Sequence, residues 1–399
     1  MEKTIVELFA GVGGFRLGFE RASPEWETVW FSQWEPGQKA QWAYNCYISH
    51  WPKSDNPTSN IDIAEVDKKT IPNHSILVGG FPCQDYSVAR PLNGASGIEG
   101  KKGILWWQIY EIVKAKKPPF ILLENVDRLL KSPAKQRGRD FGIILACLSE
   151  QGYDVEWRVI NAAEYGGAQR RRRVFILAWK RTTNYAKGII GNSKIDSQRT
   201  GFFSRVFPLE KFISFNAGII PNKDIYSISN SFCFDFGNYG TCFKGEILSA
   251  KVESKDEPYT PLREILEPHV DEKYYINGSL SKWEYLKGAK NESRKHQNGH
   301  EYKYTEGAIA FPDPLDKPSR TMLTSESTVN RSSHVIEDPE TGRLRKLTPI
   351  EAERLQGFDD DWTNTGMTER ARYFCMGNAL VVPMIERMAK EIDIIFEEE

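Results

Sequence analysis

The sequence predicts an α/β protein built on a doubly wound parallel sheet, together with a smaller domain of irregular structure. Over residues 1–180, short apolar runs alternate with segments of helical spacing, which is typical of βαβ units. From about residue 181 to 344 this rhythm is lost, and Gly, Ser, Asn and Phe become frequent. Helical patterns return in residues 345–399. We therefore predict a main domain at 1–180, an inserted domain at 181–344, and a C-terminal return at 345–399 that completes the main domain.

The strands of the main domain are predicted from its apolar runs, at residues 4–9, 28–34, 75–81, 120–126, 154–160 and 173–179. Helical spacing occurs at residues 16–22, 105–117 and 141–152. In the C-terminal return, the helix predicted over 347–358 opens with a Thr cap, a Pro and the Glu of a capping box. Residues 381–399 form a second helix with an acidic tail, whereas the polar, basic residues 287–304 are expected to form a loop. Ligands of doubly wound sheets bind at the carboxyl ends of the strands, so we expect the chemistry there.

The overall composition excludes several kinds of protein. The formal net charge of -1 gives no global sign of nucleic-acid or membrane binding, although a near-neutral total can hide a basic face. The six cysteines form no CxxC pair and no zinc-like Cys/His spacing, so we expect no metal site and a reducing compartment. No apolar run is long enough to span a membrane, and the N-terminus lacks a signal-peptide pattern. We expect a soluble, cytoplasmic protein.

A glycine turn, "ELFAGVGGFRLGFE" (7–20), lies between the first predicted strand and the first helix. Such a turn allows a ligand to approach the backbone closely, although a bare tight turn is the alternative. After Gly11 and Gly13, the third glycine of the dinucleotide fingerprint is replaced by Arg16, so the turn does not indicate a pyrophosphate.

Two further stretches support a nucleoside site. Trp34 and Glu35 end the second strand and are suited to stack on a purine and to hold ribose hydroxyls. Asp62 lies in a later loop, where a carboxylate can accept from an adenine amino group. An adenosine that lacks a diphosphate and carries a cationic sulfur indicates S-adenosylmethionine.

A thiol, an acid and a run of arginines also lie at predicted strand ends. Cys83 follows "ILVGGFP", Glu124 ends "FILLE", and residues 170–173 lead into another buried run. Period-two alternation places Arg171 and Arg173 on one face of that strand. Taken singly, the thiol is most simply core packing, the acid a solvated loop residue and the arginines a solvent or phosphate face. Their combination beside a methyl-donor site favours a catalytic role for the thiol, the acid and the arginines.

Methylation at C5 of cytosine accounts for all three groups. C5 is a poor nucleophile until a thiolate adds to C6 and makes it enamine-like. A protonated glutamate can share its proton with N3, where negative charge develops, and arginine can orient the glutamate and hold O2. Methyl transfer, loss of the C5 proton and elimination of the thiol complete the reaction.

These stretches resemble the motifs of the DNA (cytosine-5)-methyltransferases of bacterial restriction–modification systems. The matching segments occur in the family's order and are "FAGVGGF", "GGFPCQDYS", "ENV", "QRRRRVFI", "RKLTPIEAERLQGF" and "RYFCMGNALVVPM". The resemblance covers most of the chain outside the insert. It implies a Rossmann-like sheet of the S-adenosylmethionine-dependent methyltransferases.

The resemblance also implies roles for individual residues. Cys83 is expected to be the nucleophile, Glu124 the N3 acid, and Arg171 with Arg173 the substrate-orienting pair. The expected cofactor contacts are Phe9, Ala10, Gly11, Gly13, Gly14, Gln33, Trp34, Glu35, Asp62, Ile63, Pro82, Leu105, Asn378 and Ala379. The expected DNA contacts are Gln84, Ser87, Gln169, Thr321 and Met322.

Two positions depart from the family pattern. The family's ribose-binding glutamate is replaced by Gln33, so either Gln33 binds the hydroxyls as a neutral substitute or Glu35 takes that role. In "KPSRTMLTSEST" (317–328), Met322 follows Thr321 where Leu or Ile is more usual. This stretch lies near the end of the insert, which the resemblance implies to be the target-recognition region; an insert that serves only packing is the alternative.

The resemblance implies double-stranded DNA as the partner, with the target cytosine flipped out of the duplex. We expect the protein to be a monomer. A cognate restriction endonuclease that acts separately is a further partner to consider. An RNA (tRNA) cytosine-5 methyltransferase is the nearest alternative, but its Cys-Phe-Thr motif is absent, because Cys242-Phe243 is followed by Lys244. A catalytically silent DNA-binding regulator is disfavoured by the intact thiol, acid and arginines. A nicotinamide-dependent oxidoreductase is disfavoured by the incomplete glycine fingerprint.

Overall fold

The structure is a computed structural model that describes residues 1–81, 105–189, 200–221, 225–278, 280–295 and 299–399. Four of the residues selected from the sequence, Pro82, Cys83, Gln84 and Ser87, lie outside these described residues.

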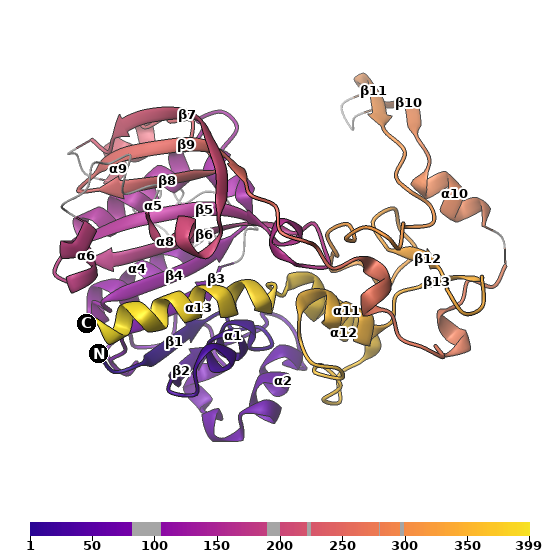
Figure 1. Ribbon diagram of the computed structural model, residues 1–399, viewed down its shortest axis with the longest axis horizontal. Coiled ribbons are helices and arrows are strands. Elements are labelled where there is room, and N and C mark those ends of the chain that lie inside the picture. Colours follow the sequence, from indigo (N-terminus) through magenta and orange to yellow (C-terminus); the bar gives the residue numbers. More distant parts are fainter. Residues whose placement is uncertain (82–104, 190–199, 222–224, 279, 296–298) are drawn as a thin grey trace.

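A single nine-stranded sheet forms the centre of the larger lobe, with the order β2-β1-β3-β4-β6-β5-β8-β9-β7 (Figure 1). Its parallel part consists of β1 (Thr4–Leu8), β2 (Glu27–Ser32), β3 (Ile76–Gly80) and β4 (Phe120–Asn125). The antiparallel part consists of β5 (Tyr153–Asn161), β6 (Arg172–Lys180), β7 (Leu209–Ile219), β8 (Tyr239–Phe243) and β9 (Glu246–Ser254). The α/β fold class is therefore confirmed.

The expectation that the whole first domain is parallel is wrong for β6, which runs antiparallel to β4 and β5. An apolar run such as "RVFILAW" has the same composition in either direction, so the sequence pattern could not decide. The reversal has a consequence for the site. The residues that precede β6 lie at the same edge of the sheet at which β3 and β4 end, with Glu124 opposite Phe175.

The insert is more regular than its composition suggested, because β7, β8 and β9 come from it and extend the large sheet. The edge strand β7 is exposed along most of its length, so its residues show no clear alternation. The domain boundaries themselves stay a prediction.

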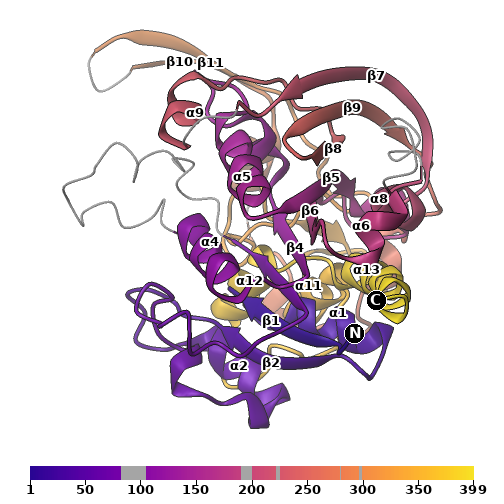
Figure 2. The same cartoon turned by 90° about the vertical axis from the view of Figure 1, so that its left-hand side faces the viewer.

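Helices cover both faces of the sheet (Figures 1 and 2). Leu77 and Ile121 belong to a core shared with α4 (Leu105–Lys116) and α5 (Arg139–Glu150). The next residues, Val78 and Leu122, belong to the core beneath α1 (Gly14–Ala22) and α13 (Val382–Glu397). The remaining helices of this lobe are α2 (Trp42–His50), α6 (Asn184–Ile189), α8 (Phe202–Val206) and α9 (Ile225–Ser231). Short 3-10 turns lie at Pro52–Ser54, Pro57–Ser59, Asp127–Lys131 and Ala162–Tyr165. The strands are thus buried on both sides, as a doubly wound sheet requires.

A second lobe lies beyond the carboxyl ends of the parallel strands (Figure 1). It contains α10 (Ser281–Lys287), the hairpin of β10 (Lys290–Lys295) and β11 (Glu301–Glu306), the hairpin of β12 (Val335–Glu337) and β13 (Leu344–Lys346), and 3-10 turns at Leu262–Ile265 and Glu272–Tyr274. The helices α11 (Pro349–Gln356) and α12 (Glu369–Asn378) lie between this lobe and the sheet. The predicted capping box of α11 is present, formed by Thr348 and Glu351.

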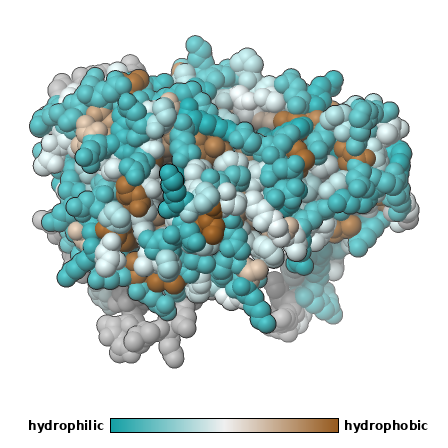
Figure 3. All heavy atoms as spheres, turned by 90° about the horizontal axis from the view of Figure 1, so that it is seen from below, coloured by the Kyte–Doolittle hydropathy of each residue, from teal (hydrophilic) through white to brown (hydrophobic). Residues whose placement is uncertain are grey.

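The face of the molecule in Figure 3 is mostly hydrophilic, with small separate hydrophobic patches. Within the described ranges, no helix is long and apolar enough to cross a membrane. The same residues contain no group of three or more His, Cys, Asp or Glu side chains that could hold a metal ion.

Candidate active site

Glu124 lies at the end of β4 and forms an ion pair with Arg173, with 2.8 Å between Nε of the arginine and Oε1 of the glutamate. Both side chains are largely buried, at 14% and 19% exposure, so solvent weakens the pair only in part. Gly80 lies opposite Glu124 in the sheet, and a Cβ there would come within 3.0 Å of Oε2. The close approach keeps the glutamate beside the end of β3.

Asn125 fixes the end of β3 from the next position of β4. Its Nδ2 donates a hydrogen bond to the carbonyl of Phe81 at 3.0 Å, and its Oδ1 accepts from the Val126 amide at 2.8 Å. Phe81 is two residues before Cys83. The sequence analysis did not select Asn125, although a polar residue that closes an apolar run was a usable signal.

Arg171 and Arg173 both face inward, whereas Arg170 and Arg172 are exposed, in agreement with the period-two alternation. Arg171 is fully buried and donates hydrogen bonds to the carbonyls of Met322, at 3.3 Å, and Gly377, at 3.1 Å. Burial, with a smaller effect from Arg173, lowers its pKa to about 9, which leaves the guanidinium protonated at neutral pH. The structure therefore gives the two arginines different surroundings: Arg173 holds the carboxylate and Arg171 holds two backbone segments.

Gln169 lies among the same segments. Its Nε2 donates to the carbonyl of Leu355 at 2.8 Å, and its Oε1 accepts from the Met322 amide at 3.3 Å. The backbone of Arg170 donates to Ser319 at 2.9 Å, and Ser319 donates to Ala168 at 2.8 Å. The amide of Gln169 is thus used within the protein, and the stretch that precedes β6 is bonded along its length to residues 319–322.

Thr321 and Met322, the pair selected near the end of the insert, point in different directions. The Thr321 hydroxyl is half-buried and donates to the carbonyl of Arg170 at 2.6 Å. Met322 is 0% exposed and packs in a core that joins the second lobe to α11, α12 and the glycine turn. In this conformation the threonine lies nearer to the surface than the methionine.

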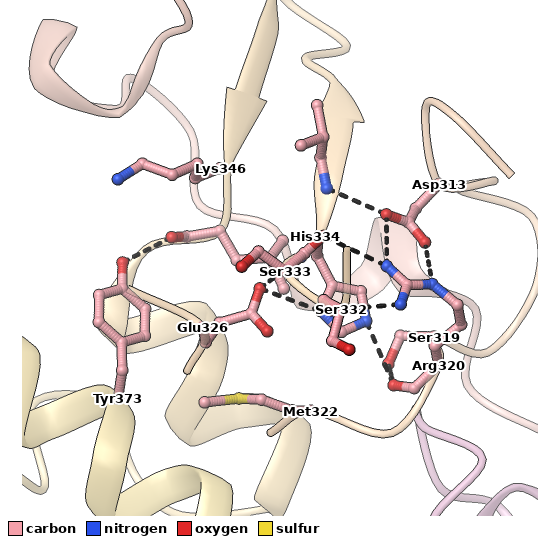
Figure 4. A network of polar contacts seen from close by, with 12 residues as sticks. Asp313, Ser319, Arg320, Met322, Glu326, Ser332, Ser333, His334, Lys346 and Tyr373 are labelled. Carbon is pink, nitrogen blue, oxygen red and sulfur yellow. Dashed lines mark hydrogen bonds and ion pairs between the residues drawn. The ribbon is translucent and has the colours of Figure 1, made fainter. Parts of the chain in front are cut away.

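A buried polar network supports residues 319–322 from the other side (Figure 4). Arg320 is bidentate to Asp313, at 2.7 and 3.1 Å, and Asp313 also accepts from the Val335 amide at 3.0 Å. Burial alone would raise the pKa of Asp313, but Arg320, His334 and the Val335 amide together outweigh burial and lower that pKa. The His334 ring lies between Oε1 of Glu326, at 3.1 Å, and the carbonyl of Arg320, at 3.2 Å. These contacts fix the segment that carries Thr321.

Gly377 explains how closely this segment approaches α12. A Cβ at residue 377 would lie 2.3 Å from the Thr324 nitrogen and 2.5 Å from the Leu323 carbonyl carbon. Only glycine permits that separation. The sequence analysis quoted the stretch around Gly377 without assigning this residue.

The glycine turn follows β1 and has the geometry that the sequence predicted. Gly11 and Gly13 have φ values of 57° and 88°, and a Cβ at Gly13 would overlap the Trp51 ring at 2.3 Å. Gln33 accepts a hydrogen bond from the Gly11 amide at 2.7 Å, so this side chain braces the turn. Glu35 accepts from the Ala43 amide at 3.0 Å in the first turn of α2, and burial raises its pKa.

The other selected cofactor residues come from several elements. Trp34 is 39% exposed directly after β2, and Asp62 accepts from the Ala64 amide at 2.9 Å in the loop that also holds buried Ile63. Gly14 lies against Leu380, whose side chain would be 2.9 Å from a Cβ at Gly14. The structure thus brings the glycine turn next to the end of α12. The remaining described residues of the selected set are Phe9 and Ala10 after β1, Leu105 at the start of α4, and Asn378 and Ala379 at the end of α12.

The family model for C-5 cytosine-specific DNA methylases matches residues 3–393. The chain belongs to this family. It is therefore a DNA (cytosine-5)-methyltransferase, and the arrangement of Glu124, Arg173 and the glycine turn around one edge of the sheet is its candidate active site.

Several named relatives agree with this assignment. The methyltransferase is 49% identical over 399 residues to the Type II methyltransferase M.Sau3AI of Staphylococcus aureus, covering 98% of this chain and 95% of the relative. It is 28% identical to the Type II methyltransferase M.SsoII of Shigella sonnei, covering 97% of this chain and 79% of the relative.

Solved structures give the same fold at low sequence identity. The Entamoeba histolytica methyltransferase EhMeth superposes with a TM-score of 0.59 at 15% identity, covering 100% of this chain and 99% of the other. The S. pombe Dnmt2 methyltransferase gives 0.58 at 16% identity, covering 99% and 98%. At these identities the likeness concerns the fold alone.

The family implies S-adenosylmethionine as the methyl donor, and the residues of the glycine turn fit such a group. Apart from its two chain neighbours, no described residue has an atom within 4 Å of the place where a Cβ at Gly11 would stand, so this part of the structure leaves the backbone there open to a ligand. The partly exposed Trp34 ring follows the neighbouring strand. A backbone turn without side chains and an exposed indole suit an adenosine that carries no phosphate.

Proposed function

We propose that this methyltransferase modifies one cytosine of a specific double-stranded DNA sequence through a covalent bond between Cys83 and C6 of a flipped base. The observation that carries the proposal is the Glu124–Arg173 ion pair at the edge of the sheet where β3 ends. The last residue of β3, Gly80, is two residues before Pro82 and three before Cys83. S-adenosylmethionine supplies the methyl group.

The residues of the chain perform the remaining steps. The Cys83 thiolate adds to C6, and Glu124 shares a proton with N3 as negative charge develops there. Arg173 orients Glu124 through their ion pair, and we assign it to donate to the O2 carbonyl of the base. After methylation, a water molecule takes the C5 proton, the electron pair of the C5–H bond forms the C5=C6 double bond, and the Cys83 thiolate leaves with the electron pair of the C6–S bond.

We propose that the glycine turn and the end of α12 bind the cofactor, that Gln33 braces the turn, and that Gln33 or Glu35 holds the ribose. Gln33 uses its amide oxygen on the Gly11 amide, and its Nε2 can donate to a hydroxyl. Glu35 has one oxygen on α2 and a second that can accept. Comparing S-adenosylmethionine affinity for Gln33→Ala and Glu35→Gln distinguishes them, because the residue that binds the ribose gives the larger loss.

We also propose that the protein acts as a cytoplasmic monomer and protects DNA from a separate restriction endonuclease. The Type II names of the relatives support the second part. Gln84, Ser87, Gln169, Thr321 and Met322 are proposed to serve DNA binding, Gln169 and Met322 by holding the backbone of the Thr321 segment.

The test of the covalent mechanism is a trapping experiment. A duplex with 5-fluorocytosine at the mapped target position should give a stable protein–DNA adduct at Cys83, because fluorine at C5 cannot leave as the proton does. Cys83→Ser should lose methyl transfer and the adduct while its S-adenosylmethionine binding stays the same. An adduct-free wild type, or an active Cys83→Ser variant, would refute the mechanism. Methylation of tRNA instead of DNA would favour the RNA alternative.

A further inference from the structure

The β10–β11 hairpin extends away from the rest of the second lobe (Figures 1 and 2). The sequence predicted a loop at residues 287–304, but two six-residue strands pair there without a bulge, from Lys290 opposite Glu306 to Lys295 opposite Glu301. Its polar side chains hid the strands, since neither face of the hairpin is buried in a core. We call these paired strands the ribbon.

One face of the ribbon is occupied by contacts within the protein. The Arg294 guanidinium stacks on the Tyr304 ring at 3.6 Å, and the Tyr285 hydroxyl of α10 donates to Glu292 at 3.0 Å. Lys290 lies 4.9 Å from the centre of the Tyr285 ring. This face, the inner face, carries the bulky side chains and is turned toward α10.

The opposite face, the outer face, carries small or flexible hydrogen-bonding groups. Asn291 lies opposite Thr305, Ser293 opposite Lys303, and Lys295 opposite Glu301, and all six are exposed. Lys295 and Glu301 form an ion pair at 2.9 Å. Within the described part of the chain, the side chains of the other two cross-strand pairs have no hydrogen-bond partner. The outer face therefore presents free donors and acceptors to solvent.

The base of the ribbon is anchored to the network that supports the Thr321 segment. Arg331 donates to the carbonyls of Leu286 and Gly288, at 2.8 and 3.1 Å, and pairs with Glu306 at 2.9 Å. Lys287 donates to the carbonyl of Ser333, which also accepts from Arg320 at 3.3 Å. A ribbon held on this network keeps a defined position relative to Arg171 and the active-site edge.

We propose that the outer face of the ribbon enters the major groove of the DNA substrate and reads base edges through Asn291, Ser293, Lys303 and Thr305. The inference rests on the proposed function, because it concerns the sequence specificity of the same reaction. The major groove admits a two-stranded ribbon, and asparagine suits adenine, lysine suits guanine, and serine or threonine suits either. The free lysine also complements the charge of the duplex. Phosphate contact alone needs neither the amide nor the two hydroxyls.

The test compares two cross-strand double variants with a matched control. The target site is first mapped with the wild-type enzyme on genomic DNA, and duplexes are then made with that site and with each single base-pair change. The variants are Asn291→Ala/Thr305→Ala and Ser293→Ala/Lys303→Ala. The control is Lys211→Ala/Ser214→Ala, which removes one lysine and one serine from exposed positions of the distant strand β7.

In each ribbon variant, the ratio of kcat/KM on the mapped site to kcat/KM on the duplexes with one changed base pair should fall about ten-fold or more. S-adenosylmethionine affinity, the unfolding midpoint and the ratio in the control should stay at wild-type values. An unchanged ratio in both ribbon variants would overturn the proposal. The proposal would also be overturned if only the Ser293→Ala/Lys303→Ala variant lost DNA affinity, by the same factor for every duplex, and if the salt dependence of its DNA binding became smaller. Such a result marks a phosphate contact. A wild type without activity on DNA would instead refute the proposed function.

Discussion

Replacing Gly377 by alanine tests the most confined contact in the site. The added Cβ would stand 2.3 Å from the Thr324 nitrogen, whereas ordinary contact begins at 3.4 Å, so the backbone of residues 323–324 must retreat by about 1 Å. The obstacle is backbone rather than the end of a flexible side chain. The retreat would also lengthen the bonds from Arg171 to Met322 and Gly377, which are already 3.3 and 3.1 Å long.

Two consequences can be measured. A hydrogen bond from a charged donor contributes about 1.5–3 kcal/mol, so losing one of the two should lower the free energy of unfolding by about 1.5–3 kcal/mol. A misplacement of about 1 Å near the reacting groups costs on the order of 100-fold in rate. Urea unfolding and kcat/KM on the mapped duplex give the two values.

Gly188→Ala is the matched control. Gly188 is exposed in α6 and has no positive φ, and outside its own helix backbone no described residue has an atom within 4 Å of its Cβ position, so alanine should be neutral or slightly stabilising there. If Gly377→Ala unfolded within about 0.5 kcal/mol of the wild type and kept its activity within the error of the control, the argument from close approach would be wrong.

Three other substitutions test the surroundings of the site. Glu124→Gln should keep the shape of the side chain but lose the acid and the ion pair with Arg173, lowering kcat by about 100-fold or more with little change in cofactor affinity; a kcat near the wild-type value would contradict its proposed role. Asn125→Ala should free the Phe81 carbonyl and lower kcat while leaving S-adenosylmethionine affinity unchanged, and an unchanged kcat would remove Asn125 from the site. Burial raises the pKa of Glu7 from 4.5 to about 7, so the folded chain binds a proton on this carboxyl more tightly than the unfolded chain does. Protonated Glu7 therefore contributes its full stability below pH 4.5, and this contribution is lost as the pH rises to 7. Glu7→Gln should therefore exceed the wild type in stability above pH 7, by up to about 3 kcal/mol, and lose that advantage near pH 4.5; a gap independent of pH in urea titrations would contradict this.

The parts of the site that follow from strand order were predictable from the sequence. Glu124 closes an apolar run, so its place at the carboxyl edge was predictable, and period-two alternation placed Arg171 and Arg173 on one face of their strand. Only the family resemblance put Arg173 beside Glu124, because a residue that precedes a parallel strand would lie at the other edge. The direction of β6 was not predictable, because a strand buried on both faces lacks the apolar–polar alternation that is typical of antiparallel strands. That reversal is what brings the arginine stretch to the ends of β3 and β4.

Contacts between distant segments could not be predicted at all. The bonds of Arg171 to Met322 and Gly377 join stretches more than 150 residues apart, and the alternation indicates only that the side chain faces inward. The use of Gln33 as a brace of the Gly11 amide depends in the same way on where two loops meet. Strands β7, β10 and β11 were missed because exposed edges and ribbons do not need apolar alternation.

The position of α13 affects how the chain is made in the cell. Its residues Ile385, Ile392 and Phe396 pack in one core with Ile5 and Phe19, so β1 and α1 are covered by a helix that is synthesised long after them. During translation the apolar face of β1 and α1 stays uncovered until α13 has emerged from the ribosome. Such long-range closure slows folding and makes chaperone binding to the growing chain an expected stage of its biogenesis.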